Sequence, residues 1–307
     1  MVERDPNPDI SRPPQTDARS RPTTMQEALR QRTDRLPDNH PSSAAFQAER
    51  TREQAPRSRT PEQSALARPD TEQPAEADDE PRTGSDGSWE WKGYRLTPDE
   101  SHAADRALER FRDFEGRDHD GSYTDRGLTP AMRRIEAALD HGHLVDKTEE
   151  FALKSPARFK EKLASLISDA PEISPEDHIE AIHDAVRYTF IFDCDDYLTG
   201  ISSASGELTG GGFQLGVRKN TWGHDEYKAV NTQWRDLESG LKFEVQFHTQ
   251  ASWEAKQQTH EAYEKIKDPR TSPEVREQLR LYQRKVAIQL VAPDGIDTLN
   301  DYRRDDW

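Results

Sequence analysis

A short alternating segment carries the side chains best suited to chemistry. Within residues 241–248, apolar side chains alternate with Glu244, Gln246 and His248. Because successive side chains of a strand point to opposite faces, the three polar groups share one face of an expected strand. Such a row is often only a solvent-facing surface. An acid, an amide and an imidazole in line are also what a catalytic or binding site requires.

The preceding segment adds to the same patch. A strand is expected over residues 227–234, and a turn at residues 236–240 joins it to the next strand as an antiparallel hairpin. Tyr227, Ala229 and Asn231 share a face of that strand. We therefore expect an aromatic ring and an amide beside the Glu-Gln-His row.

Three cations supply the opposite charge. Lys154, Arg158 and Lys162 are spaced four residues apart where a helix is expected over residues 155–168, so they are predicted to lie along one helix face. The row would span about 12 Å at the helical rise per residue. It is either a solvated basic face or a binding surface for a polyphosphate. A local basic row in a chain of net charge −16 favours the second interpretation.

A carboxylate stands where a buried strand begins. Asp184 precedes residues 186–192, a β-branched and aromatic segment that predicts a strand. There it is placed to hold Mg²⁺ together with Glu244, since Mg²⁺ is usually bound by one or two carboxylates plus substrate phosphates. His183-Asp184 lacks the helical context of metal-dependent phosphohydrolases. Residues 210–212 are glycines without the Lys-Ser/Thr of a phosphate-binding loop, so they predict a turn.

The elements that position these groups alternate between helix and strand. Helices are expected over residues 97–114, 129–139, 155–168, 174–183, 194–208, 252–266 and 273–290, and strands over residues 186–192, 213–218, 227–234 and 241–248. Several of the helices begin with Ser or Thr followed by Pro, which favours a helix start. The pattern predicts an α/β (α+β) fold with a mixed sheet of about five strands flanked by helices.

Composition divides the chain near residue 88. Twelve of the 20 prolines lie at or before Pro81, and Phe46 is the only aromatic residue before Trp89. A segment this polar cannot bury enough surface to offset its ordering entropy, so residues 1–88 are predicted to be a disordered tail. Residues 89–298 are predicted to form one domain, and residues 299–307 to be loosely ordered.

Several classes of protein are excluded or made improbable by composition. The single cysteine, Cys194, excludes an internal disulfide and a cysteine-based zinc site. The absence of any long apolar run and of a secretory signal predicts a cytoplasmic protein with no membrane span. The acidic balance argues against a general polyanion binder.

Five segments follow one another in the order of a known family. They are LKSPARFKEKL (153–163), HDAVRYTFIF (183–192), RKNTWGHDEYKAVNTQWRD (218–236), FEVQFHT (243–249) and THEAYEKI (259–266). Together they resemble the synthetase domain of the RelA/SpoT family, which makes the alarmone (p)ppGpp on a nucleotidyltransferase-like fold. The residues of these segments are most similar to those of an actinobacterial branch of the family, which includes ATP nucleotide 3′-pyrophosphokinases and toxin-like small synthetases.

The resemblance implies a role for each matching position. Asp184 and Glu244 would hold Mg²⁺ and, with Gln246, form the catalytic set. Lys154 and Lys162 match basic positions that would bind the ATP phosphates. Arg158, which stands where the family commonly has Ser, is expected to join them as a member of the basic row. Lys219, Tyr227, Asn231 and His248 would bind the acceptor, with Tyr227 stacked on its purine, and Arg187 and His260 would support the site.

The implied reaction moves the β,γ-pyrophosphate of ATP to the 3′-hydroxyl of a purine nucleotide and releases AMP. The acceptor stays open between GDP or GTP and ADP or ATP, because differences from the family fall on the acceptor side, where Asn231 replaces its usual His and His248 its usual Arg. A further departure is Ala152, which stands at the position of the family's adenine-stacking Arg. Two alternatives remain: a toxin that modifies the 3′ end of tRNA, and an inactive nucleotide-binding module that regulates a partner. The sequence does not determine the oligomeric state.

Overall fold

A mixed six-stranded sheet is the centre of the fold. The computed structural model describes residues 80–118 and 121–307, so most of the predicted tail lies outside the described residues. The strands of this sheet are β4 (His143–Leu144), β5 (Arg187–Phe192), β6 (Phe213–Asn220), β7 (Val230–Asp236), β8 (Lys242–Thr249) and β9 (Tyr302–Arg303). Their order is β4-β5-β8-β7-β6-β9, and β5 and β8 run parallel while the other neighbours are antiparallel.

This mixed sheet with flanking helices confirms the predicted fold class, and the four expected strands correspond to β5–β8. Two differences concern length. The edge strands β4 and β9 have two residues each, too few to show an alternating pattern in the sequence. The strand expected from residue 227 begins only at Val230, so Tyr227 and Ala229 lie in the loop before β7.

Alternation along the central strands separates an apolar face from a polar one. On β5, Tyr188, Phe190 and Phe192 are almost completely buried, and β8 contributes Phe243, Val245 and Phe247 in the same way. Since the parallel register pairs Phe190 with Phe247, these rings lie on the same side of the sheet, and their centroids are 6.2 Å apart. The residues between them must therefore point to the other face.

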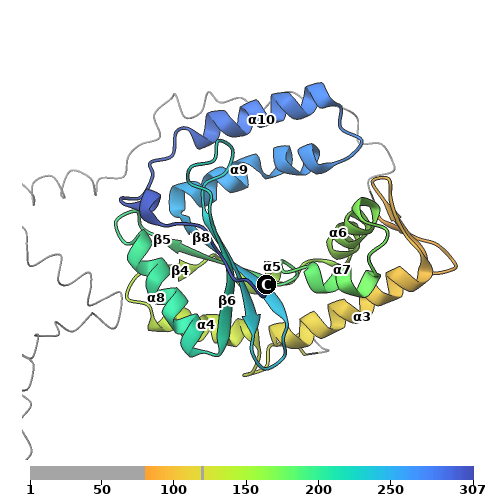
Figure 1. Cartoon of the computed structure of the whole chain (residues 1–307), viewed down its shortest axis with the longest axis horizontal. Coiled ribbons are helices and arrows are strands. Elements are labelled where there is room, and N and C mark those ends of the chain that lie inside the picture. Colours follow the sequence, from red (N-terminus) through yellow and green to blue (C-terminus); the bar gives the residue numbers. More distant parts are fainter. Residues whose placement is uncertain (1–79, 119–120) are drawn as a thin grey trace, which may run out of the picture. The chain divides into compact units, whose positions relative to one another are not determined.

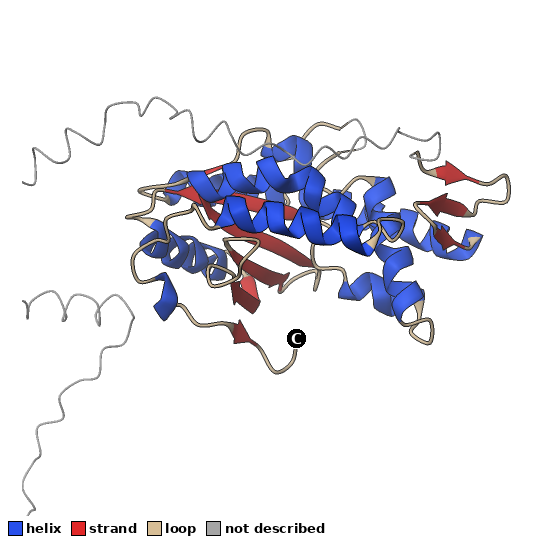
Figure 2. Ribbon diagram, turned by 90° about the horizontal axis from the view of Figure 1, so that it is seen from above, coloured by secondary structure: helices blue, strands red, loops and turns tan. Residues whose placement is uncertain are grey.

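The helices of the described residues are α3 (Pro98–Glu115), α4 (Leu128–Ala138), α5 (Thr148–Phe151), α6 (Pro156–Asp169), α7 (Pro175–Ala181), α8 (Tyr197–Gly210), α9 (Gln250–Lys267) and α10 (Pro273–Ala287). Figure 1 shows α4 and α8 beside the sheet and α9 beside α10. In Figure 2 the two long helices α9 and α10 run side by side, joined by a small apolar cluster that includes Leu279 and Tyr282. None of the described helices has the length and apolarity needed to cross a membrane.

The starts of α3, α6 and α7 agree with the Ser/Thr-Pro signals, whereas α4 begins at Leu128 after Gly127 and has no side-chain cap, so Thr129 lies inside that helix. Thr97 caps α3 and forms a capping box with Glu100, while Ser155 and Ser174 cap α6 and α7 by accepting a backbone N–H three residues on. These caps satisfy amide groups that have no partner inside the helix. The start of α6 at Pro156 leaves Lys154 outside the helix, so the three cations do not form the single helical row that the sequence predicts.

A small antiparallel sheet precedes α3. Its strands are β1 (Arg82–Thr83), β2 (Trp89–Trp91) and β3 (Tyr94–Leu96), and Arg82 pairs with Glu90. The boundary expected at residue 88 therefore falls inside this sheet. The reason is that β1 is short and polar, and its two side chains carry no apolar signal.

The end of the chain is held more firmly than expected. Residues 299–307 were predicted to be loosely ordered, but β9 pairs with β6, and the Trp307 indole N–H donates to Gln233 Oε1 at 3.1 Å. Trp307 covers Gly216, where a Cβ would collide with its ring, and its face lies 5.0 Å from the Arg235 guanidinium. The absence of a side chain at Gly216 in β6 thus leaves room for the indole of Trp307, a contact that depends on tertiary structure.

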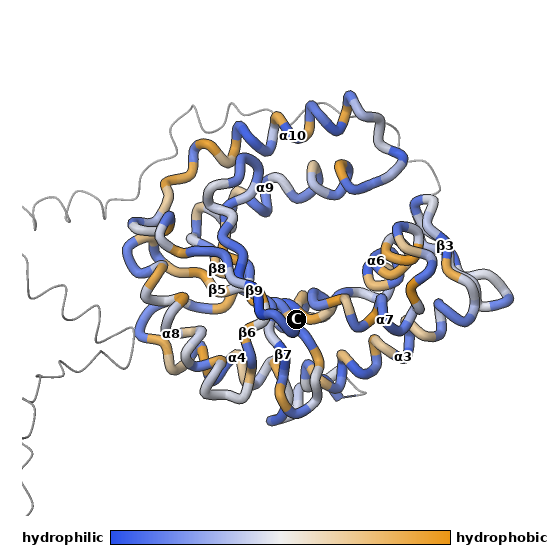
Figure 3. Tube along the Cα trace, viewed as in Figure 1, coloured by the Kyte–Doolittle hydropathy of each residue, from blue (hydrophilic) through white to orange (hydrophobic). Residues whose placement is uncertain are grey.

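Figure 3 shows that hydrophilic residues gather along this last segment.

Packing between α8 and β5 gives a matched pair of glycine variants. A Cβ at Gly200 would collide with the ring of Phe192, which is 1% exposed, whereas a Cβ at Gly206 in the same helix meets open space. We expect Gly200→Ala to lower the free energy of unfolding by about 1–3 kcal/mol through overpacking. Gly206→Ala should raise it by up to about 1 kcal/mol, since alanine loses less backbone entropy. Urea unfolding measures both, and equal effects would contradict this packing.

Candidate active site

The polar face of the sheet collects the predicted site residues by strand register. Arg187 of β5 pairs with Glu244 of β8, which pairs with Gln233 of β7. Two residues further along β8, Gln246 pairs with Asn231 of β7. Directly paired residues point to the same face of a sheet. The Glu-Gln-His row is therefore not a solvent surface: Glu244, Gln246 and His248 are 9%, 6% and 0% exposed, respectively.

Arg187 lies between the two carboxylates predicted to bind a metal. Its Nη2 donates to Asp184 Oδ2 at 3.0 Å, and its Nε lies 2.9 Å from Glu244 Oε1. Lys154 Nζ donates to the same Asp184 oxygen at 2.9 Å. This lysine is positioned by backbone bonding, because its N–H donates to Ala185 O at 2.8 Å just before β5. Asp184 and Glu244 are thus joined through a shared cation.

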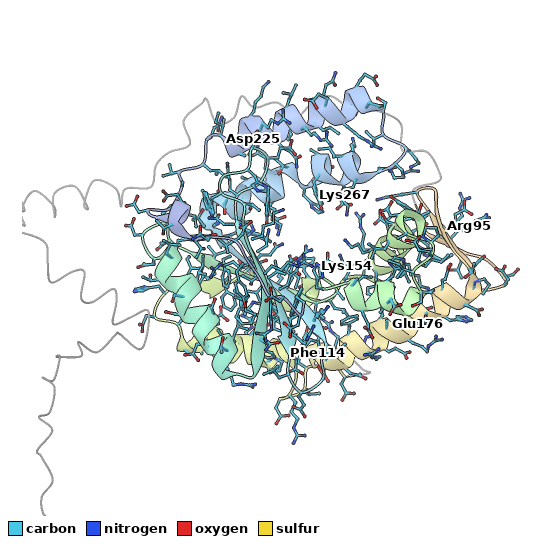
Figure 4. All side chains as sticks on the ribbon, viewed as in Figure 1. Arg95, Phe114, Lys154, Glu176, Asp225 and Lys267 are labelled. Carbon is cyan, nitrogen blue, oxygen red and sulfur yellow. The ribbon has the colours of Figure 1, made fainter. Side chains whose placement is uncertain are left out.

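The chain of contacts continues toward α9. The Gln246 amide donates to Glu244 Oε1, and Lys256 Nζ donates to Gln246 Oε1 at 2.6 Å. Six side chains, here called the polar network, are therefore connected from one end to the other: Lys154, Asp184, Arg187, Glu244, Gln246 and Lys256. Figure 4 shows Lys154 at the centre of the view.

Electrostatics keep the network charged at its Asp184 end. Burial opposes ionisation of Asp184, but Lys154 and Arg187 outweigh it and hold the pKa of this carboxyl well below its usual range. Lys162 of α6 acts in the same direction. For Lys154 burial prevails, so the pKa of its ammonium is lowered although Asp184 opposes the change. An anion that displaced part of this pairing would meet cations that are already in position.

A second cluster lies beside the network on the acceptor side predicted from sequence. The Tyr227 hydroxyl donates to Asn231 Oδ1 at 3.1 Å and also lies 3.1 Å from His248 Nε2. His248 Nδ1 is 2.8 Å from the Oγ of Ser252, which is the third residue beyond the end of β8. The rings of Tyr227 and His248 meet edge to face with centroids 5.6 Å apart. We call Tyr227, Asn231, His248 and Ser252 the tyrosine cluster.

Three other predicted residues lie apart from these contacts. Arg158 is paired with Glu161 and Glu264 and stacks 5.1 Å from the centroid of the Trp91 ring. Lys219 of β6 is exposed, although its cross-strand partner is Asn231. His260 is exposed on α9, and its side chain makes no hydrogen bond or ion pair with the rest of the described chain. The structure therefore brings together the carboxylates, Arg187, Lys154 and the tyrosine cluster, but not these three.

Lys256 belongs to the network but was not singled out by its sequence. It lies four residues after Ser252 and four before His260, so one face of α9 carries all three. That spacing from the Glu-Gln-His strand is the signal that could have identified it. Its Nζ also lies 4.6 Å from the centroid of the Trp253 ring.

A cavity of about 370 Å³ lies between α3, α7 and the β7–β8 hairpin, and no residue of the polar network or the tyrosine cluster lines it. Arg110, Arg235 and Lys242 line it together with Glu180. Lys242 lies two residues before Glu244 in β8, and therefore on the same face of that strand. Arg235 and Lys242 also lie over the ring of Trp307, each 5.0 Å from its centroid.

The donor atoms present suit Mg²⁺ shared with a phosphate substrate. Within residues 80–118 and 121–307, no three His, Cys, Asp or Glu side chains gather into a metal site of their own. Asp184 and Glu244 nevertheless each engage a single oxygen in the network, Oδ2 and Oε1. Mg²⁺ is commonly held by one or two carboxylates, with waters and substrate phosphates completing its shell. The two carboxylates fit that arrangement.

The buried imidazole of His248 predicts acid sensitivity. Burial, reinforced by Lys256 and Arg187, lowers the pKa of His248 well below its ordinary value. Below about pH 6.5 the unfolded chain takes up a proton that the folded chain resists. The stability linked to this group is therefore present above that pH and lost as the pH falls.

We expect the free energy of unfolding to fall less steeply between pH 7.5 and pH 5 in His248→Gln than in the wild type. The slope should differ by up to about 1.4 kcal/mol per pH unit. His260→Gln, at an exposed position of α9, is the control and should keep the wild-type slope. Urea titrations across this range measure it, and parallel slopes for all three proteins would contradict the assignment.

Comparison with known proteins gives matches among solved structures. No protein-family model matches the chain, and no curated protein matches it. Small alarmone synthetase 1 from Bacillus subtilis is 13% identical, with 61% of this chain and 88% of that chain covered and a TM-score of 0.35. A GTP pyrophosphokinase family protein from Streptococcus pneumoniae is 10% identical, with 61% and 83% covered and a TM-score of 0.33.

A chain in the complex between the Type VI effector Tas1 and its immunity protein is 17% identical, with 64% of this chain and 100% of that chain covered and a TM-score of 0.36. The alarmone synthetases among these matches are the family that the five sequence segments resemble.

Proposed function

We propose that this chain transfers the β,γ-pyrophosphate of ATP to the 3′-hydroxyl of a purine nucleotide and releases AMP. The observation that carries the proposal is the polar network. It places two carboxylates and three cations in contact on one face of the sheet, and the tyrosine cluster adjoins it through the Gln246–Asn231 pair. A triphosphate requires cations and carboxylate oxygens, which the polar network contains. A purine requires an aromatic face, which Tyr227 of the tyrosine cluster can offer.

Each part of the site has a role in this reaction. Lys154 and Lys162 bind phosphate oxygens of ATP. Arg187 contacts both carboxylates and orients them, and it helps to keep Asp184 charged. The ring of Tyr227 offers a face to the acceptor base, since its hydroxyl is held by Asn231 and His248. Bound to Asp184 and Glu244, Mg²⁺ would neutralise and polarise the phosphates. Catalysis then consists mainly of positioning and charge stabilisation, as in other phosphoryl transfers.

A labelled-ATP screen tests the proposal directly. The purified chain is incubated with ATP labelled on the γ-phosphate, and in parallel on the α-phosphate, with GDP, GTP, ADP, additional ATP, tRNA or no acceptor. We expect the γ label in a new nucleotide and the α label in an equal amount of AMP. Formation of ADP would show simple phosphate transfer and would overturn the proposal, as would the absence of any product. Label in the tRNA arm alone would favour the toxin alternative.

The carboxylates provide the first variant test. Asp184→Asn and Glu244→Gln keep the shape of each side chain but remove the charge that a metal and Arg187 require. We expect each to lower kcat by more than about 100-fold at saturating Mg²⁺. Asp169→Asn, an exposed position at the end of α6, is the matched control and should retain wild-type activity. If either site variant, measured as folded protein, has the wild-type rate, then that carboxylate does not bind a metal that the reaction needs.

The aromatic ring of Tyr227 provides the second variant test. Base–aromatic stacking contributes on the order of 1–3 kcal/mol, so Tyr227→Ala should raise the acceptor KM roughly 5- to 150-fold and leave the ATP KM nearly unchanged. Tyr227→Phe keeps the face and loses only the bonds to Asn231 and His248, so its effect should be small. Separate KM values for the two substrates decide the matter. An equal effect on both would show that Tyr227 serves packing rather than acceptor recognition.

A further inference from the structure

We propose that Lys256 takes the proton of the acceptor's 3′-hydroxyl, an assignment that rests on the proposed function. Neither carboxylate has this task in the proposed site, because Asp184 and Glu244 are bound to cations. The roles given above leave out two members of the polar network, Gln246 and Lys256, and of these two only the lysine amine can take up a proton.

Lys256 lies where the two halves of the site meet. Its Nζ is 2.6 Å from Gln246 Oε1, and the amide of Gln246 reaches Glu244. Gln246 is also the cross-strand partner of Asn231, which binds the Tyr227 hydroxyl. The amine is therefore next to the strand position that links the carboxylates to the tyrosine cluster. A hydroxyl presented between a phosphate and the tyrosine cluster would approach this amine.

The contacts of Lys256 differ from those of Lys154. Lys154 has a carboxylate partner, whereas no carboxylate within the described chain lies at ion-pair distance from Lys256. Its partners are an amide oxygen and the face of Trp253. An amine held in this way is not obliged to carry a proton.

The charged and titratable groups around this amine come from several elements. They are Arg187 of β5, Glu244 and His248 of β8, and Glu226, Tyr227 and Lys228 of the loop before β7, with the neutral Gln283 on the α10 side. Burial, reinforced by Arg187 and opposed by Glu244, lowers the pKa of Lys256 to about 7. A substantial fraction of the amine is then neutral near physiological pH.

Two neighbouring groups are engaged elsewhere. Both nitrogens of His248 have partners, Tyr227 and Ser252. Glu244 contacts Arg187 and Gln246 through one oxygen, and its second oxygen is the one that suits Mg²⁺. Among Glu244, His248 and Lys256, the lysine amine is the group left to take a proton.

The step balances without a further reactant. As O3′ of the acceptor forms its bond to the β-phosphorus of ATP, the hydroxyl proton moves to the neutral Nζ of Lys256. The bond from that phosphorus to the α,β-bridging oxygen breaks, and AMP leaves with the electron pair. The resulting ammonium releases its proton to solvent before the next turnover.

Two substitutions separate a base from a fixed cation. Lys256→Met removes the amine, and Lys256→Arg keeps a charge that is never lost at neutral pH. If Lys256 is the base, both variants should lower kcat by about 10²- to 10⁴-fold, while the ATP KM changes by less than about threefold. Lys285→Met, an exposed position on α10, is the control and should behave as the wild type. Activity of Lys256→Arg within about threefold of the wild type would show a purely electrostatic role and overturn the proposal.

A second readout does not depend on turnover. Reductive methylation with ¹³C-formaldehyde labels the lysines of the folded chain, and Lys256→Arg identifies the resonance of Lys256 by its absence. We expect that resonance to titrate near pH 7, and the wild-type kcat/KM to fall about tenfold per pH unit below it. A titration near pH 10 would overturn the role of Lys256 alone. Absence of transfer by the wild type in the labelled-ATP screen would instead overturn the proposed function, whatever the titration shows.

Discussion

The ion pairs of Arg187 are the interactions on which the candidate site depends. A guanidinium placed between Asp184 and Glu244 lets two carboxylates occupy the same partly buried face without facing each other unpaired. Charges removed from water must be paired, and loss of one partner leaves the other at a high cost. Arg187 can do this because the parallel register of β5 and β8 places it directly opposite Glu244, three residues after Asp184.

The polar face of the sheet is backed by an opposite face that is largely apolar. The alternation that sends Phe243, Val245 and Phe247 into the core sends Glu244 and Gln246 to the site. A register shift of one residue would exchange the two faces, so the apolar core also fixes the register of the polar network. Stability and the proposed chemistry therefore depend on the same pairing of strands, which explains why the network can be nearly buried and still be well defined.

The two ends of the polar network differ in chemical character. At one end Lys154 and Asp184 form a charged pair, which suits an exchange of partners with phosphate and metal. At the other end Lys256 contacts an amide oxygen and an aromatic ring, and no carboxylate of the described chain pairs with it. The same sheet face thus offers a fixed charge for a triphosphate and a titratable amine for a hydroxyl, with Gln246 between them. This division matches the two substrates of the proposed reaction.

Much of the fold follows from local sequence. The caps at Thr97, Ser155 and Ser174 and the period-two pattern of β8 are local signals, and the structure has these elements within a few residues of their expected bounds. The short strands β1, β4 and β9 were missed because two residues cannot show a period. The seat of Trp307 on Gly216 was missed because it joins positions far apart in the chain.

The candidate site likewise has features that follow from local sequence and features that depend on the tertiary structure. The sequence by itself determined which side chains share a face, because alternation along β8 requires only the residues of that strand. It did not determine that Arg187 pairs with both carboxylates, that Arg158 binds Glu161 and Glu264 instead of joining a row with Lys154, or that Lys256 reaches Gln246. Those outcomes depend on strand order and on where α6 and α9 pack. Charged side chains form ion pairs with the groups that lie within a few ångströms of them, and only the tertiary structure sets those distances.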